Sequence, residues 1–174
     1  MDEKKAKILV KRVRILLVIL ICIWIMVVFF FSQQNGESSG GLSYKIAKLI
    51  FKNEEVAKSM EVYVRKLAHM FEYAVGGGLF CTLFMTYNLD FWKRNLSVTT
   101  IVTALAALDE LHQHFVPGRN GVWYDVLIDA AGCILGVFIV HVIFSLINVV
   151  DYLAVTDISK VQEKEELDDP YRMK

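Results

Sequence analysis

The sequence predicts an all-α, polytopic membrane protein: a bundle of four transmembrane helices, with a short extracytoplasmic amphipathic helix between helices one and two. Hydrophobic residues make up 55% of the 174 positions, and they lie in long runs almost free of charge. This composition excludes intrinsic disorder, which requires low hydrophobicity. The 19 basic residues balance the 19 acidic ones, so there is no electrostatic basis for a nucleic-acid partner.

The first transmembrane helix is expected at about residues 15–34. Residues 15–31 carry no charge, and with their flanks they are long enough to cross a bilayer. Residues 1–14 form a basic arm that we place in the cytoplasm. A cleaved signal peptide is the alternative, but the apolar run is longer than a signal core and no small-x-small cleavage site follows it.

The loop after the first helix contains the expected amphipathic helix. Residues 44–52 pair apolar with basic side chains at helical spacing, which is typical of a helix that lies on a membrane surface. Asn53, followed by Glu54 and Glu55, predicts a helix N-cap. The helix that it opens is expected to run into the second transmembrane helix, at about residues 66–87.

The remaining two transmembrane helices carry charge near one end. The third, at about 96–115, has only 13 uncharged residues before Asp109, so it spans only if it includes acidic side chains. Pro117 is expected to stop it. The fourth, at about 123–150, begins with Asp125 and Asp129. Residues 151–174 form a charged tail, which we expect to be cytoplasmic and either a fraying helix or disordered.

The distribution of Lys and Arg predicts the orientation. With the N-terminus inside, the cytoplasmic segments hold 12 of these residues and the outer segments hold 7. We therefore expect a multi-pass protein of the bacterial cytoplasmic membrane with both termini in the cytoplasm. In this topology the charged ends of helices two, three and four all lie in the outer leaflet.

Helical spacing groups these polar residues on shared faces. Ionisable residues inside a membrane are functional-site candidates, because burying them there is costly. The short turn at residues 116–121 is expected to bring an arginine back over the carboxylates. The expected ligand-binding residues are Arg65, His69, Glu72, Tyr73, Asp109, Glu110, Gln113, Arg119, Asp125 and Asp129.

The same residues carry a family resemblance. Arg65-Lys66-x-x-His69-x-x-Glu72-Tyr73, then Asp109-Glu110-x-x-Gln113-x-Phe115-x-Pro117-Gly118-Arg119, then Asp125 and Gly132 resemble the VanZ-like family of bacterial membrane proteins. The resemblance covers about residues 65–136. It implies a cell-envelope role and lowered susceptibility to teicoplanin, a lipoglycopeptide antibiotic that acts at the outer face of the membrane. It implies no reaction. Asp129 departs from the family pattern, which commonly has Asn there.

Binding is the first of three hypotheses for the polar cluster. Arg65 and Arg119 would grip a phosphate or carboxylate through bidentate hydrogen bonds. Suitable ligands are a lipid headgroup, a lipid-linked wall precursor or an amphiphilic antibiotic. Tyr73, Trp123 and Tyr124 would supply a rim at headgroup depth. Membrane lipids are the expected partners, and a homodimer fits a small bundle without following from the sequence.

The other two hypotheses are catalysis and structure. A membrane-embedded hydrolase or transferase acting on a lipid headgroup would draw on His69, Glu72, Asp109, Glu110 and Asp125, with His69 as general base. A divalent metal held by four of these residues is a variant of that hypothesis, but no metal or cofactor is assigned. In the structural hypothesis the arginines neutralise the carboxylates and lock the helix ends together. The three cysteines are expected to be small buried residues without a disulfide.

Overall fold

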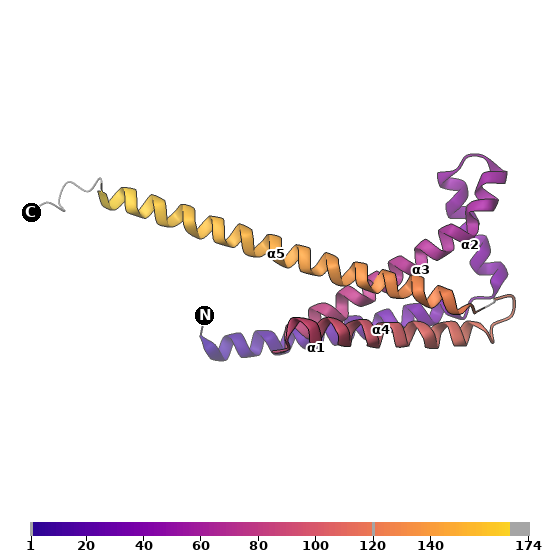
Figure 1. Ribbon diagram of the computed structural model, residues 1–174, viewed down its shortest axis with the longest axis horizontal. Coiled ribbons are helices and arrows are strands. Elements are labelled where there is room, and N and C mark those ends of the chain that lie inside the picture. Colours follow the sequence, from indigo (N-terminus) through magenta and orange to yellow (C-terminus); the bar gives the residue numbers. More distant parts are fainter. Residues whose placement is uncertain (1, 120, 168–174) are drawn as a thin grey trace, which may run out of the picture. The chain divides into compact units, whose positions relative to one another are not determined.

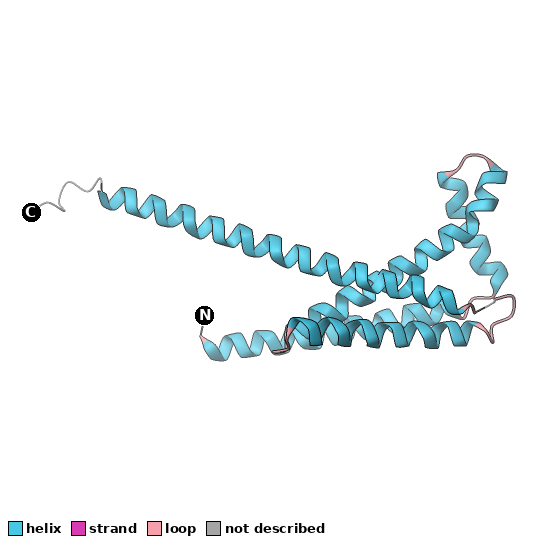
Figure 2. Cartoon of the chain, in the orientation of Figure 1, coloured by secondary structure: helices cyan, strands magenta, loops and turns pink. Residues whose placement is uncertain are grey.

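The computed structural model describes residues 2–119 and 121–167, without the side chains of residues 36–38 and 153–167. The described residues form helices and no strands (Figures 1 and 2). In chain order the helices of the described residues are α1 (Glu3–Ser32), α2 (Gly36–Ile50), α3 (Glu54–Met85), α4 (Phe91–Gln113) and α5 (Trp123–Leu167). The predicted all-α class is confirmed.

The chain divides into two units, residues 1–138 and residues 139–174. The first unit contains α1 to α4 and the beginning of α5, and it includes every predicted site residue. The second unit continues as helix to Leu167. The expected tail is therefore helical as far as that residue, and residues 168–174 lie outside the described part of the chain.

The helix bounds differ from the expected ones mainly at the N-terminal ends. α1 begins at Glu3 because the Asp2 side chain accepts a hydrogen bond from the backbone of Lys4, so the basic arm is helical. α3 begins at Glu54, twelve residues before the expected span. The Asn53 side chain accepts from the N–H groups of Glu55 and Val56, at 2.9 and 3.3 Å. The N-cap predicted at this position is confirmed.

Three of the described helical segments are long and apolar enough to cross a membrane: Glu3–Ser32, Glu54–Met85 and Trp123–Tyr152. α4 is not apolar enough to be counted with them. Many of the large apolar side chains of α1 are exposed, as expected of a helix in contact with lipid; Met26 is 61% and Phe30 is 65% exposed. The apolar helices are compatible with a membrane protein.

Side-chain contacts fix the relative directions of α1 and α3. Arg14, in the first half of α1, donates hydrogen bonds to the side-chain and backbone oxygens of Thr86, the residue just after α3. Further along α1, the Trp24 indole donates to the carbonyl oxygen of Glu72 at 2.9 Å. Since residue numbers rise along α1 and fall along α3, the two helices are antiparallel.

Two glycines of α5 let it cross α3 at close range. A Cβ built on Gly132 would overlap the backbone of Met70, and one built on Gly136 would overlap the backbone of Ala74. The two pairs have the same offset in residue number, so the part of α5 that belongs to the first unit runs parallel to α3. The two glycines lie four residues apart on one helix face, which is the spacing of small residues that lets two helices approach closely. Consequently the predicted polar residues of α3 and α5 lie at the same end of the first unit.

Helices α2 and α3 pack together as a hairpin beside that end. Ala47 of α2 and Ala57 of α3 are fully buried. Lys48 and Glu54 form an exposed ion pair at 2.5 Å, and this pairing raises the pKa of Lys48. The predicted amphipathic helix therefore exists, and it is longer than expected because it begins at Gly36.

The cysteines of the described residues are free, as expected. Cys81 and Cys133 are fully buried, which agrees with their predicted role as small packed side chains. Cys22 is exposed, so the expectation that all three are buried was wrong. It lies on the outward face of α1, where the neighbouring side chains are apolar.

Candidate functional site

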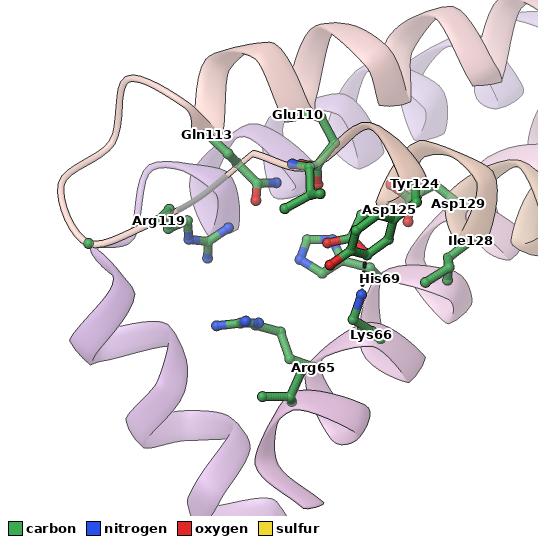
Figure 3. Close-up of a pocket in the computed structure, with 13 residues that line it drawn as sticks. Arg65, Lys66, His69, Glu110, Gln113, Arg119, Tyr124, Asp125, Ile128 and Asp129 are labelled. Carbon is green, nitrogen blue, oxygen red and sulfur yellow. Dashed lines mark hydrogen bonds and ion pairs between the residues drawn. The ribbon is translucent and has the colours of Figure 1, made fainter.

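A polar cavity of about 250 Å³ lies between α3, the end of α4, the turn that follows α4 and the beginning of α5 (Figure 3). Seven of the ten predicted ligand-binding residues line it. They are Arg65, His69, Glu110, Gln113, Arg119, Asp125 and Asp129, and the other lining residues are Val62, Lys66, Gly118, Val122, Tyr124 and Ile128. Residues far apart in the sequence thus meet at one place, as the helical spacing predicted.

The two arginines face this cavity, and neither forms an ion pair with a carboxylate of the described residues. Arg119 donates one hydrogen bond, to the carbonyl oxygen of Phe31 at 2.9 Å, while its Nε and Nη1 are buried without an acceptor among the described residues. Arg65 has no hydrogen bond or ion pair within the described part of the chain. Burial lowers the pKa of Arg119, and the nearby positive charge of Arg65 lowers it further. The arginines therefore present a concentrated positive charge to the cavity.

The turn that carries Arg119 follows directly from its sequence. α4 ends at Gln113, and the backbone of Arg119 donates to the carbonyl of Val116 at 3.1 Å. Gly118 adopts a φ of 74°, which a side chain would make unfavourable. The predicted tight return is confirmed, and it places the Arg119 side chain on the cavity (Figure 3).

Most carboxylates near the cavity are already bound by the protein. Asp125 forms an ion pair with Lys66, a residue that the sequence reasoning did not include in the site. Glu110 accepts a hydrogen bond from the backbone N–H of Val122 at 2.9 Å, and Asp109 accepts one from the Gln113 amide at 2.8 Å. The structural hypothesis expected the arginines to pair with these acids. Their hydrogen bonds and ion pair come instead from a lysine and from amide groups.

Asp129 is the exception among these acids. Its side chain is 1% exposed, and neither carboxylate oxygen has a hydrogen-bond donor among the described residues. A buried carboxylate without a partner is costly, because it has lost water and gained nothing in exchange. The polar cavity thus contains unused donors on Arg119 and unused acceptors on Asp129.

His69 and Glu72, two of the candidate catalytic residues, are close neighbours without a hydrogen bond between them. The His69 Nδ1 and Glu72 Oε2 atoms are 3.8 Å apart, which is longer than a hydrogen bond. Among the residues described by the structure, no three His, Cys, Asp or Glu side chains are placed to hold a metal ion. Nothing in the geometry therefore favours the catalytic hypothesis over binding.

A second, apolar cavity of about 370 Å³ adjoins the polar one. Arg65, His69 and Arg119 line both cavities. The walls of the apolar cavity come from three helices, with Trp24, Val27 and Phe31 from α1, Leu42 from α2, and Phe71 and Val75 from α3. Glu72, expected in the polar cluster, lines this cavity instead. The arrangement therefore puts two guanidinium groups at the junction of a polar and an apolar space.

Tyr73 and Asp109 lie elsewhere. Both line a third cavity of about 190 Å³, between α1 and α4, in which the ring of His112 lies 5.0 Å from that of Phe29. Tyr73 is fully buried, so its predicted position in an aromatic rim was wrong. Trp123 and Tyr124 are 75% and 46% exposed, as a rim requires. Burial separates residues that their spacing along α3 had grouped together.

The sequence reasoning missed the residues of α1 and α2. Trp24, Phe31 and Leu42 look like ordinary apolar residues of a membrane helix and of a loop, and no motif distinguishes them. Lys66 had a detectable signal, since it directly follows Arg65 in the pattern that carries the family resemblance. The contribution of α1 follows only from its antiparallel packing on α3.

Apolar helices of membrane-spanning length, with a polar cavity at one end of the bundle, are compatible with a helical membrane protein that has a candidate ligand site. The VanZ/LLP1 family model matches residues 17–145, and the protein therefore belongs to the VanZ/LLP1 family. The match includes all ten predicted ligand-binding residues. Comparison with curated proteins and with solved structures gives no match.

Proposed function

We propose that this VanZ/LLP1 protein binds an anionic amphiphile at the outer leaflet of the bacterial cytoplasmic membrane, and that it thereby lowers susceptibility to teicoplanin-type antibiotics. The ligand would be a lipid headgroup, a lipid-linked wall precursor or the lipoglycopeptide itself. The observation that carries the proposal is the pair Arg65 and Arg119, which face one cavity and form no ion pair with a carboxylate in the part of the chain that the structure describes. Two guanidinium groups so placed favour a phosphate or carboxylate.

The adjoining apolar cavity supports an amphiphile rather than a free anion. Arg65, His69 and Arg119 line both spaces, so a ligand with its anionic group at the arginines has its hydrocarbon part beside Val27, Phe71 and Val75. Burying hydrocarbon there contributes about 0.8 kcal/mol per methylene group. A soluble anion gains none of this free energy.

The proposal includes a topology of four spans, with both termini in the cytoplasm. Packing supports it, because α1 and α3 are antiparallel, α3 and α5 are parallel, and α4 connects the last two helices. α4 must then also cross, with Asp109 and Glu110 near its outer end. The excess of Lys and Arg on the predicted inner segments agrees with this direction.

Quenching of Trp24 fluorescence tests the binding. Trp24 lines the apolar cavity, whereas Trp92 and Trp123 are 80% and 75% exposed. The full chain with Trp92→Phe and Trp123→Phe is placed in phosphatidylcholine nanodiscs with increasing brominated phosphatidylglycerol. We expect Arg119→Ala to raise the half-quenching mole fraction by about tenfold or more, because a charge-assisted hydrogen bond contributes about 1.5–3 kcal/mol.

Two controls accompany this measurement. Arg119→Lys keeps the charge but not the planar fork, so its half-quenching mole fraction should lie between those of the wild type and Arg119→Ala. Lys93→Ala removes an exposed cation at the start of α4 and should change nothing. Equal quenching in Arg119→Ala and the wild type would contradict the proposal. In cells, Arg119→Ala should also restore teicoplanin susceptibility.

Cysteine labelling tests the topology. In a chain without its native cysteines, a cysteine at Arg119 should react with an impermeant maleimide added outside the cell, and one at Lys93 should react only after the membrane is opened. Arg119 lies in the turn between α4 and α5, and Lys93 lies in the first turn of α4. Labelling at Arg119 only from the cytoplasmic side would reverse the proposed orientation.

A further inference from the structure

We infer that the ligand is an aminophospholipid, with its phosphate at Arg65 and Arg119 and its primary ammonium group at Asp129. This inference rests on the proposed function and names the headgroup class. It begins from Asp129, which is 1% exposed, lines the polar cavity and has no hydrogen-bond donor to either oxygen among the described residues. The neighbouring acids Asp125 and Glu110 each have a partner.

Opposite charges are separated across the polar cavity. Figure 3 shows Arg65 and Arg119 on one side and Asp125 and Asp129 on the other, with the His69 ring between them. Three cations (Arg65, Lys66 and Arg119) balance three acids (Glu110, Asp125 and Asp129) among the lining residues. Lys66 lies on the acidic side and pairs with Asp125. Among the described lining residues, the arginines and Asp129 therefore face each other across the cavity without ion-pair partners, an arrangement that complements a zwitterion better than a simple anion.

A purely anionic headgroup leaves the acidic side of this cavity unchanged. The phosphate compensates the arginines, but Asp129 stays buried without a partner. An ammonium group close to the phosphate supplies up to three N–H donors to the two free oxygens of Asp129. Ethanolamine-type headgroups carry both groups a few bonds apart. A quaternary ammonium group has the charge but no N–H donor.

A bound metal ion is the competing occupant for Asp129. Within the part of the chain that the structure describes, no three His, Cys, Asp or Glu side chains are placed to hold one. Lys66 pairs with Asp125, so that carboxylate is already occupied and is not free to bind a metal ion. An organic ammonium group needs only one carboxylate and a space to enter, and the polar cavity provides both.

The single-tryptophan chain allows a direct test. Brominated phosphatidylethanolamine is compared with brominated phosphatidylglycerol in phosphatidylcholine nanodiscs, both with the same acyl chains. We expect phosphatidylethanolamine to reach half-quenching of Trp24 at an about tenfold lower mole fraction, the effect of one charge-assisted hydrogen bond. Asp129→Asn should remove this preference while phosphatidylglycerol still quenches, which also shows that the variant is folded.

The controls separate this inference from the proposed function. Asp90→Asn changes an exposed acid at the start of α4 and should keep the preference. Equal quenching by the two lipids in the wild type, or a preference that survives Asp129→Asn, overturns the inference and leaves the proposed function intact. A preference that requires Mg²⁺ or Ca²⁺ and vanishes with chelator also overturns it, in favour of a metal. No saturable quenching by either lipid overturns both.

Discussion

The two ends of the helix bundle use an arginine in opposite ways. At the closed end, defined by Arg14, Leu17, Ile21, Leu83, Thr86 and Tyr87, the Arg14 guanidinium donates two hydrogen bonds to Thr86 and lies 4.0 Å from the centre of the Tyr87 ring. At the open end, which is the polar cavity, Arg119 donates one hydrogen bond and keeps two nitrogen atoms unused.

Packing follows the same division. Leu17, Ile21 and Leu83 are buried together at the closed end, with Leu79, Phe80 and Phe84 against them. The open end has polar and apolar cavities instead. Unused hydrogen-bonding groups are costly when buried, so a protein keeps them mainly where a ligand supplies the missing partner. The comparison therefore assigns stability to the closed end and binding to the open end.

The largest effect is expected from a substitution that disrupts the close crossing of α3 and α5 at the open end. Gly132→Leu puts a side chain where the backbone of Met70 lies, and we expect a loss of more than about 3 kcal/mol in the free energy of unfolding. Asp129, one turn earlier on α5, would move away from α3, so lipid binding should also be lost. Thermal unfolding in detergent and Trp24 quenching measure the two effects.

Gly41→Leu is the matched control for this change. A Cβ built on Gly41 meets nothing within 4 Å. The free energy of unfolding of this variant should therefore lie within about 0.5 kcal/mol of the wild-type value. If Gly132→Leu were as stable as Gly41→Leu and still bound lipid, the close crossing of α3 and α5 would not be what positions the site.

The next prediction compares the two arginines: substitution at the closed end should lower stability, and substitution at the open end should weaken binding. Arg14→Met removes two hydrogen bonds and a cation–π contact and should cost about 2–3 kcal/mol of stability, with lipid affinity unchanged. Arg119→Met should weaken lipid binding by about tenfold or more with little loss of stability. Unfolding and Trp24 quenching are measured on both variants.

This crossed pattern is the sharpest test of the division. A result in which Arg14→Met weakens binding as much as Arg119→Met would mean that the two ends are not independent. An Arg119→Met variant that loses as much stability as Arg14→Met would favour the structural hypothesis for the arginines.

A smaller effect concerns the ion pair between Lys66 and Asp125. Lys66→Met leaves the half-buried Asp125 carboxylate without its partner and should cost about 1–2 kcal/mol. Combining it with Asp125→Leu should recover part of that loss, because the two changes share one interaction. Thermal unfolding of the single and double variants gives the coupling free energy.

The exposed pair Asp90 and Lys93 is the reference for this cycle. Their side chains are about three-quarters exposed, and an ion pair in water contributes little, so its coupling should be close to zero. Equal coupling in the two pairs would mean that burial at the open end does not strengthen the Lys66 interaction.

The smallest expected effect is the pH dependence of the hairpin between α2 and α3. Glu54 raises the pKa of Lys48 above its ordinary 10.5, so the folded state holds this proton more tightly than the unfolded chain. The contribution of the pair is therefore complete below pH 10.5 and is lost as the pH rises through the raised value. At pH 8, Lys48→Gln should unfold at a slightly lower temperature than the wild type. In alkali the difference between the two unfolding temperatures should vanish.

Thermal unfolding from pH 8 to pH 11 checks this sign. A difference between Lys48→Gln and the wild type that grows with pH would contradict it. The lipid affinity measured by Trp24 quenching should be the same in both, because Lys48 lines neither the polar nor the apolar cavity.

Local features of the fold were predictable because they depend on neighbouring residues. Asn53 caps α3 and the Pro117-Gly118 turn returns the chain, since a cap and a turn need only the side chains and backbone within a few positions. Gly132 and Gly136 also follow from spacing, because a pair four residues apart lies on one helix face. Helical periodicity likewise predicted most of the charged and amide side chains that line the polar cavity.

The partners of the polar residues were not predictable in this way. Lys66 and not an arginine pairs with Asp125, and Tyr73 is buried although it shares a face with Arg65. Each outcome depends on how far a side chain reaches between helices whose separation the sequence does not state. α4 illustrates the same limit, because its composition does not establish a membrane span although it packs beside helices that meet the criteria.

The sequence by itself determined the all-α class, the N-cap at Asn53, the start of α5 at Trp123, and the family pattern of a VanZ/LLP1 protein. These depend on short-range spacing and on composition. Only the tertiary structure decided that Trp24 and Leu42 form an apolar cavity next to the polar one, and that Arg119 and Asp129 keep unused hydrogen-bonding groups. Whether a group finds a partner depends on distances between helices, and packing alone sets those distances.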